Sequence, residues 1–493
     1  MHVELPTDHL VLAGAALLIL GVVGAGIAER IRVPGLLLFL LLGMGLGDDG
    51  LNWISLADAE LAQGIAVGAL VVILYEGGLG TAFRDVRKVA APAVSLATVG
   101  VAVTAAVVAG AASVLFDIDT TTALLLGAVV ASTDAAAVFS ALQQVGMPRR
   151  LAHLLEAESG TNDPMAVLLT VGLLAAWEGQ VTAADWLVFG VRQLVGGLVV
   201  GVGIGWVGAE LLTRVRLTSS SLYPVLGLAI GGLAYGAAAG LRMSGFLAVY
   251  LAGMTVAARA PARRRAVRTF HQGLASTAQI GLFLLLGLLV FPSRLDEEAA
   301  AAFGVAVVLV FVARPLAVVV AVGWMRFTKA ELLLVSWAGL RGAVPIVLAT
   351  FPLTEGHPDG QLIFDVVFFV VVLSVLLQGL TVASLARRLG MVAEPDVAAS
   401  IAEALPIDAP GVEVLEIEVG TECGIVGRAL VDAPPPLEAR VAVILRGTDV
   451  VVPTGATAPA AGDRLIVFGP ADPDLASAVR AWVTNPTSVS SAR

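Results

Sequence analysis

Apolar segments about as long as a bilayer is thick recur along the first 390 residues, and short polar stretches separate them. A membrane-spanning helix needs about 20 mostly apolar residues. The pattern therefore predicts an all-α polytopic membrane protein over residues 1–390, with thirteen transmembrane helices near 9–28, 34–47, 60–80, 89–115, 120–144, 151–177, 184–212, 222–240, 243–258, 270–291, 299–323, 330–352 and 361–386.

Charged residues in the loops between these segments predict an orientation. Lys and Arg gather in the loops that follow odd-numbered helices, whereas the loops after even-numbered helices are mostly acidic. Cytoplasmic loops carry the excess of basic residues. We therefore expect a multi-pass protein of the cell membrane, surrounded by lipid, with its N-terminus outside and its C-terminus in the cytoplasm.

The sixth predicted helix begins with a polar stretch that contains Glu158, Ser159, Asn162 and Asp163. Charged groups within a membrane are costly, and they usually mark an ion or proton pathway. Residues four apart in a helix lie on one face, so Ser159 stacks on Asp163 and Glu158 stacks on Asn162. The alternative is a polar helix start that ends in a turn at Asp163-Pro164.

Two further predicted helices, the fifth and the twelfth, carry helix-breaking residues near mid-membrane. The fifth has Thr133 and Asp134 within 131–137, and the twelfth has Arg341 between two glycines within 337–345. Interrupted helices at corresponding places are typical of transporters built from inverted repeats, whose site lies at the crossing. An offset of seven helices fits two six-helix repeats around a linker helix. The alternative is that the glycines serve close helix packing.

An aspartate in a low-dielectric cavity, such as Asp163, can hold a proton or a dehydrated alkali cation, but not both. That competition couples opposite fluxes through one alternating-access site. Oxygen atoms of Asp163, Ser159 and the Thr133 region suit a hard monovalent cation. Asn162 is neutral, so one titrating carboxylate predicts electroneutral exchange of one proton per cation.

Other charges inside the predicted helices need partners or a way out of the membrane. An unpaired charge at this depth would be costly, so we expect Glu158 to form an ion pair with Arg341 between the sixth and twelfth helices. We interpret Glu76 as a structural charge near the end of the third helix. Arg314 is interpreted as a long side chain that reaches the cytoplasmic surface.

Composition changes after residue 390. The chain is 58% hydrophobic and 14% charged with a mean hydropathy of +0.92, yet residues 391–493 hold fourteen acidic and six basic residues, most of the net charge of −10. Prolines in 391–410 predict a linker, and 486–493 are predicted to be a disordered tail. Between them we expect a small cytoplasmic α+β domain over 411–485, with strands at 412–419, 440–445, 449–452 and 464–468 and helices at 425–430 and 474–483.

Three motifs, Ser132-Thr133-Asp134, Glu158 to Pro164 and Gly339 to Ala343, together resemble the cation:proton antiporter-1 family of NhaP- and NHE-type exchangers. The resemblance implies an NhaA/NhaP-like fold and a homodimer with a core domain and a dimerisation domain. Family members often have Leu or Val where this chain has Thr161. The resemblance assigns roles to seven residues: Asp163 for ion and proton binding, Asn162, Ser159 and Thr133 for site structure, Asp134 for the unwound crossing, and Glu158 with Arg341 for the ion pair.

The C-terminal domain resembles the TrkA-C or RCK-C subdomain of potassium-conductance regulators at 427–430, 443–447 and 461–467. Such domains usually dimerise, and some bind a small regulatory ligand such as a cyclic dinucleotide. The tail has no Gly-x-Gly-x-x-Gly turn, so we do not expect NAD or ATP sensing. Antiporters of this build with such a tail are often potassium/proton exchangers, which favours K⁺/H⁺ over Na⁺/H⁺ exchange.

Other functional classes fit less well. A ligand-gated cation channel would need a carbonyl filter sequence, and none is present. A membrane sensor without transport is opposed by the complete set of motif residues. An enzyme is not expected, because the five histidines are scattered and the single Cys423 cannot form a disulfide or a metal cluster within the chain. We expect no cofactor and no nucleic-acid partner.

Overall fold

The computed structural model describes residues 8–31, 35–47, 49–53, 59–81, 83–142, 147–179, 182–217, 219, 221–290, 292–391, 412–447, 449–470, 472 and 475–485. The chain divides into two compact units, Met1–Val392 and Ala393–Arg493. Most of the predicted linker and the whole predicted disordered tail lie outside the described residues.

The first unit is helical, and each of the predicted apolar segments coincides with one helix or with a linked pair. Three π-helical turns, η1 (Leu96–Gly100), η2 (Leu309–Ala313) and η3 (Val375–Gly379), join α4 to α5, α13 to α14 and α17 to α18. The helices are α1 (Asp8–Ile31), α2 (Gly35–Leu46), α3 (Ala59–Gly80), α4 (Phe83–Ser95), α5 (Val101–Leu115), α6 (Thr120–Val129), α7 (Ala135–Leu142), α8 (Arg149–Glu178), α9 (Ala183–Arg214), α10 (Leu222–Gly240), α11 (Gly245–Arg259), α12 (Pro261–Leu288), α13 (Pro292–Val308), α14 (Arg314–Val322), α15 (Lys329–Trp337), α16 (Ala343–Thr354), α17 (Gly360–Ser374) and α18 (Leu380–Arg388).

Several of these helices can cross a bilayer by length and composition. Within the described residues, six qualify: Ala59–Gly80, Arg87–Leu115, Ala184–Arg214, Leu222–Gly240, Glu298–Val322 and Gly360–Arg388. The two broken helices are not among these six because each half is a separate, shorter helix. Helix α8 is not among them either, and it carries polar residues in its first half. The fold is that of a polytopic membrane protein.

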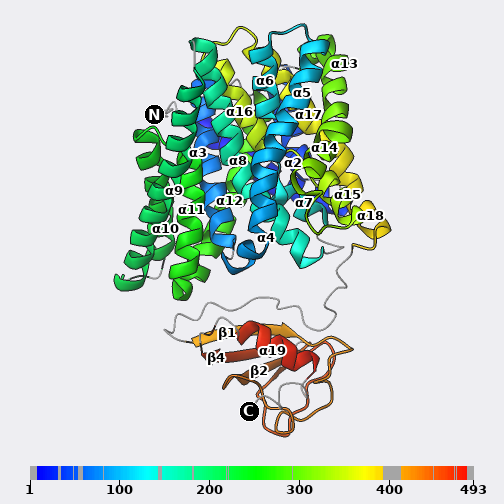
Figure 1. Cartoon of the computed structure of the whole chain (residues 1–493). Coiled ribbons are helices and arrows are strands. Elements are labelled where there is room, and N and C mark those ends of the chain that lie inside the picture. The colour runs from blue at the N-terminus through cyan, green and yellow to red at the C-terminus, as the bar shows by residue number, and fades with distance from the viewer. Residues whose placement is uncertain are drawn as a thin grey trace, which may run out of the picture. The chain divides into compact units, whose positions relative to one another are not determined.

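The helices of the first unit pack as two bundles. A scaffold bundle consists of α1–α3 with α9–α12, and a site bundle consists of α4–α8 with α13–α18. Figure 1 shows α9, α10 and α11 together on one flank and α13 and α14 on the other. The bundles meet where α3 and α12 contact α16 and where α3 and α11 contact α8.

The second unit is an antiparallel sheet of order β1-β4-β2-β3 with one helix. Its elements are β1 (Val412–Glu418), β2 (Arg440–Arg446), β3 (Asp449–Val451), β4 (Arg464–Pro470) and α19 (Leu475–Thr484). Buried residues on the covered face include Leu465 of β4 and Ile444 of β2, which are paired in register, and Trp482 of α19. The predicted strands and closing helix are confirmed to within a few residues.

The prediction of a short helix over 425–430 was wrong, because the structure has turns there. Gly427 adopts φ +73°, a left-handed conformation that ends any helical run. Its N–H donates to the carbonyl of Pro459 across the domain, instead of to a carbonyl one turn back.

Candidate ion-binding site

Two unwound segments cross in the site bundle. One separates α6 from α7 and the other separates α15 from α16, as the sequence predicted for the fifth and twelfth segments. They touch through their backbones, since the Asp134 N–H donates to the Leu340 carbonyl over 2.8 Å. The breaks therefore expose backbone groups to one another and to side chains at the centre of the bundle.

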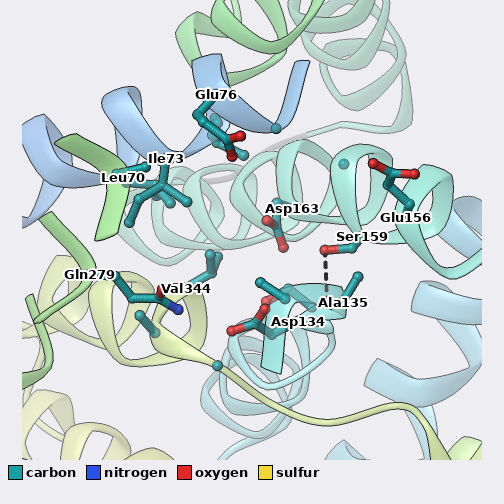
Figure 2. Close-up of a pocket in the computed structure, with 18 of the residues that line it drawn as sticks. Leu70, Ile73, Glu76, Asp134, Ala135, Glu156, Ser159, Asp163, Gln279 and Val344 are labelled. Atoms are coloured by element: carbon teal, nitrogen blue, oxygen red, sulfur yellow. Dashed lines mark hydrogen bonds between the residues drawn. The ribbon is translucent and has the colours of Figure 1, made fainter. Parts of the chain in front are cut away.

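Helix α8 supports the first break with the polar face predicted from its spacing. The Ser159 hydroxyl accepts a hydrogen bond from the Ala135 N–H at 3.3 Å, as Figure 2 shows. The Asn162 side-chain amide donates to the Thr133 hydroxyl at 2.6 Å. Ser159 and Asn162 thus hold the residues on either side of Asp134.

Asp163 is buried on α8 beside this crossing. Its side chain is 6% exposed, and its Oδ1 has no hydrogen-bond partner among the residues that the structure describes. The Asn162 Oδ1 and the Ser132 hydroxyl are buried and unpartnered in the same part of the chain. Buried polar atoms normally have a partner, so these oxygens are available to a proton or a cation.

A cavity of about 490 Å³ opens onto Asp163. Its lining combines the first break and α8 from the site bundle with α3, α11 and α12 from the scaffold bundle, so it lies at the seam of the two bundles. Figure 2 shows Asp163, Ser159 and Asp134 facing this space, with Glu76 and Gln279 contributed by helices of the scaffold bundle. Glu76, interpreted as a structural charge from the sequence, is therefore a cavity residue.

The Asp134 carboxylate faces the second break. Its Oδ1 accepts from the Ala137 N–H at 3.1 Å, which caps the start of α7. A Cβ at Gly342 would overlap the same carboxylate. Only glycine fits at position 342, because the Asp134 carboxylate approaches its backbone closely. The sequence did not predict this contact, although the position of Gly342 beside Arg341 in the broken segment pointed to a special role.

The buried partner of Glu158 is Arg314, and the predicted pair with Arg341 is not what the structure shows. The guanidinium of Arg314 makes two hydrogen bonds to the Glu158 carboxylate, at 2.6 and 3.0 Å, and the two side chains are 3% and 1% exposed. Arg314 follows η2 directly, and a Cβ at Gly339 would collide with its side chain. Arg314 points inward because the glycine leaves room for it, and it does not reach the membrane surface.

Arg341 instead binds the backbone of the first break. Its guanidinium donates to the carbonyls of Ala131 and Ser132 at 2.7 and 2.6 Å, and the side chain is 1% exposed. Carbonyls at the end of an interrupted helix lack partners in their own chain segment. Arg341 therefore stabilises the break immediately before Thr133 and Asp134.

The described part of the chain contains no group of three or more His, Cys, Asp or Glu side chains arranged to hold a metal ion. Carboxylate, amide and hydroxyl oxygens remain the available donors at the crossing, and such donors suit hard cations.

Known proteins resemble this chain over most of its length. The chain is 37% identical over 470 residues to a protein named "K(+)/H(+) antiporter NhaP2" from Shewanella oneidensis, covering 93% of this chain and 80% of the relative. It is 41% identical over 413 residues to "K(+)/H(+) antiporter NhaP" from Alkalimonas amylolytica, covering 83% and 71%. A third relative, "Na(+)/H(+) antiporter NhaP" from Pseudomonas aeruginosa, is 31% identical, covering 72% and 89%.

The fold has also been seen before. The sodium proton antiporter MjNhaP1 from Methanocaldococcus jannaschii, solved at pH 8, superposes with a TM-score of 0.69 at 24% identity, covering 77% of this chain and 99% of that one. The TrkA-C domain model matches residues 414–477. The model described as "Sodium/hydrogen exchanger, transmembrane" matches residues 15–388. With the crossing, the buried aspartate and these similarities together, the chain belongs to the sodium/hydrogen exchanger family.

Proposed function

We propose that the protein is a secondary antiporter that exchanges a monovalent cation, K⁺ in preference to Na⁺, for protons. The observation that carries this proposal is the buried Asp163 carboxylate, which has an unpartnered oxygen and opens onto the cavity at the crossing. A proton or a dehydrated cation can satisfy that oxygen, and each excludes the other. Alternating exposure of the site then exchanges one for the other across the membrane.

The other residues of the site have separate proposed roles in cation binding and in support of the break. Ser159, Asn162 and Thr133 hold the first break, and Ser159 and Thr133 also line the cavity, so they are the proposed cation ligands beside Asp163. Asp134 is assigned the role of capping α7, because its Oδ1 already accepts from the Ala137 N–H, whereas an oxygen of Asp163 is unpartnered. Asp163 is then the carboxylate that titrates, and one proton exchanges for one cation without net charge movement.

The identity of the cation rests on the relatives. Two relatives, matched over 93% and 83% of this chain, are named as K⁺/H⁺ antiporters, and a third is named as a Na⁺/H⁺ antiporter. We therefore place K⁺ first and keep Na⁺, with Li⁺, as the alternative.

The topology is proposed from the same pattern. Thirteen helical segments cross the membrane, with residues 1–390 as the transporter domain, 391–410 as a linker and 411–485 as the regulatory domain. The breaks in the fifth and twelfth segments and the π-turns η1 and η2 in the fourth and eleventh all differ by seven segments, which supports inverted repeats. The N-terminus lies outside and the tail in the cytoplasm, as the basic loops indicate.

We also propose how the protein assembles and how its transport is regulated. Both the membrane unit and the TrkA-C domain contribute to a homodimer. The tail regulates exchange by binding a small ligand, for which a cyclic dinucleotide is the candidate.

Transport in proteoliposomes tests the function. Dissipation of an imposed pH gradient is followed after addition of KCl, NaCl or LiCl, with wild type beside Asp163→Asn. We expect K⁺ to dissipate the gradient most strongly and the mutant to be silent. Asp117→Asn is the matched control, because Asp117 is exposed in a loop at φ +51°, which asparagine also adopts.

Three results would change the proposal. Exchange that survives Asp163→Asn would remove that residue from the site. A sustained transport current driven by voltage would contradict electroneutral exchange. If wild type is silent, a chain ending at Gly390 separates inhibition by the tail from a lack of transport.

A further inference from the structure

A second set of buried polar side chains, on α17 and η3, also supports the crossing. Ser374 ends α17 and Gln378 lies in η3, and each is 1% exposed. The Ser374 hydroxyl accepts from the Arg341 N–H at 3.1 Å and donates to the Gln378 Oε1 at 2.6 Å. The Gln378 amide in turn donates to the Trp337 carbonyl at 3.0 Å.

These bonds satisfy the two ends of the second break. Trp337 is the last residue of α15, and Arg341 precedes the first residue of α16 by two positions. Their backbone carbonyl and N–H would otherwise be buried without a helical partner. The Trp337 carbonyl can only accept, so it fixes the amide nitrogen of Gln378 toward itself and leaves Oε1 to accept from Ser374. The three bonds therefore form one connected brace.

The first break is held in the same manner by a different helix. There Ser159 accepts a backbone N–H, that of Ala135, and Asn162 donates its side-chain amide to Thr133. The sixth segment therefore supports the fifth, and the thirteenth supports the twelfth. In both cases a serine accepts an N–H, and an amide three or four residues later donates.

We propose that Ser374 and Gln378 are positioning residues of the ion site, the counterparts in the second repeat of Ser159 and Asn162. This inference rests on the proposed antiport function. Neither residue lines the cavity, so each acts through Arg341. Arg341 is held at its backbone by Ser374, and its guanidinium holds the carbonyls of Ala131 and Ser132.

The brace therefore bears on cation affinity more than on the translocation step. Release of the Arg341 backbone lets Ala131 and Ser132 relax, and the next two residues along the chain are Thr133 and Asp134. Loss of one buried hydrogen bond is therefore expected to raise the half-saturating cation concentration by about three- to tenfold.

The variants are Ser374→Ala and Gln378→Met, with Ser374→Thr as the conservative rescue that keeps a hydroxyl. Thr381→Val is the matched control. Thr381 lies in α18, directly after η3, and it also bonds to Trp337. It accepts from the indole Nε1 at 2.9 Å and makes no bond to the unwound backbone.

Two measurements are made on each full-length protein. One is the K⁺ concentration that gives half-maximal dissipation of a pH gradient, together with the maximal rate. The other is the K⁺ concentration that half-saturates thermal stabilisation of the purified protein, which needs no transport. We expect both concentrations to rise about three- to tenfold in Ser374→Ala and Gln378→Met, with maximal rates within about twofold of wild type. Ser374→Thr and Thr381→Val should behave as wild type.

The inference is overturned if the half-saturating concentrations are unchanged, or if Thr381→Val raises them equally. It is also overturned if the melting temperature without K⁺ falls while the half-saturating concentration stays constant, because that result describes a purely structural brace. If Ser374→Ala does not fold, Gln378→Met decides by the same criteria. Failure of the antiport proposal would appear separately, as an inactive wild type, and the thermal assay would still test the brace.

Discussion

Glu158 on α8 and Arg314 on α14 are joined by two parallel hydrogen bonds in the interior of the site bundle, at 2.6 and 3.0 Å. The pair ties the helix that carries Asp163 to the helix that follows η2. Both side chains are almost fully buried, so water cannot solvate either charge. A buried charge that loses its partner costs more than the intact pair contributes.

Removal of one partner is therefore expected to destabilise the protein strongly. Glu158→Gln leaves the Arg314 guanidinium uncompensated and should lower the free energy of unfolding by about 3–5 kcal/mol. The measurement is thermal unfolding of the purified protein in detergent, with folded yield as a second readout.

Charge exchange identifies the partner. We expect Glu158→Arg with Arg314→Glu to recover more folded protein than either single change. Glu158→Arg with Arg341→Glu should recover none, because Arg341 binds carbonyls and not the carboxylate. Rescue by the Arg341 exchange alone would contradict this assignment.

Gly342 should tolerate no side chain. In Gly342→Ala the new Cβ would overlap the Asp134 carboxylate, so the crossing must shift, and we expect exchange to fall about tenfold or more. Gly281→Ala on α12 is the control, because a Cβ there meets nothing within 4 Å. Rates of pH-gradient dissipation for the two variants give the comparison, and equal rates would show that the close approach has no functional weight.

Thr161 stands where the resemblance leads us to expect Leu or Val, and the structure predicts that this difference has little effect on cation binding. Its hydroxyl donates to the carbonyls of Ala157 and Glu158 in its own helix, and it does not line the cavity. Thr161→Val should leave the half-saturating K⁺ concentration within about twofold of wild type. Ser159→Ala, two residues earlier and on the cavity, should raise it. A large effect of Thr161→Val would place its hydroxyl in the ion pathway.

The tail contains an acid-sensitive contact between Asp463 and Arg446. Side-chain hydrogen bonds from Arg446, at 2.7 and 2.8 Å, hold the pKa of the Asp463 carboxyl below its usual range. The folded pKa lies below the unfolded value of about 4, so the stabilisation is present above that pH and is lost as the pH falls through the folded pKa.

We therefore expect Asp463→Asn to destabilise the tail at neutral pH and to differ less from wild type below about pH 4. Hydrogen exchange of the β4 peptide in the full-length protein, taken as the ratio of mutant to wild type at each pH, measures this. Asp449→Asn, an exposed aspartate of β3, is the control. If this ratio is the same at neutral pH and below about pH 4, the Asp463 carboxylate is not the cause of the destabilisation.

The sequence by itself determined the helical segments, the two breaks and the polar face of α8. Membrane-length apolar runs, helix-breaking residues and four-residue spacing are local properties, so they fix which residues share an element and a face. Ser159 and Asp163 lie at the cavity for that reason, and the alternating residues of 412–418 form a strand as predicted. The single buried face expected for that strand was wrong, because Val414 to Ile417 are all buried.

Only the tertiary structure decided which buried charges meet. Glu158, Arg314 and Arg341 lie on three different elements, and spacing within a helix says nothing about the rotation and depth of one helix relative to another. The space beside Gly339 directs Arg314 to Glu158, and the carbonyls freed by the first break attract Arg341. The sequence could not predict the brace of Ser374 and Gln378 for the same reason, because the backbone groups that it satisfies lie at the second break and not in its own helix.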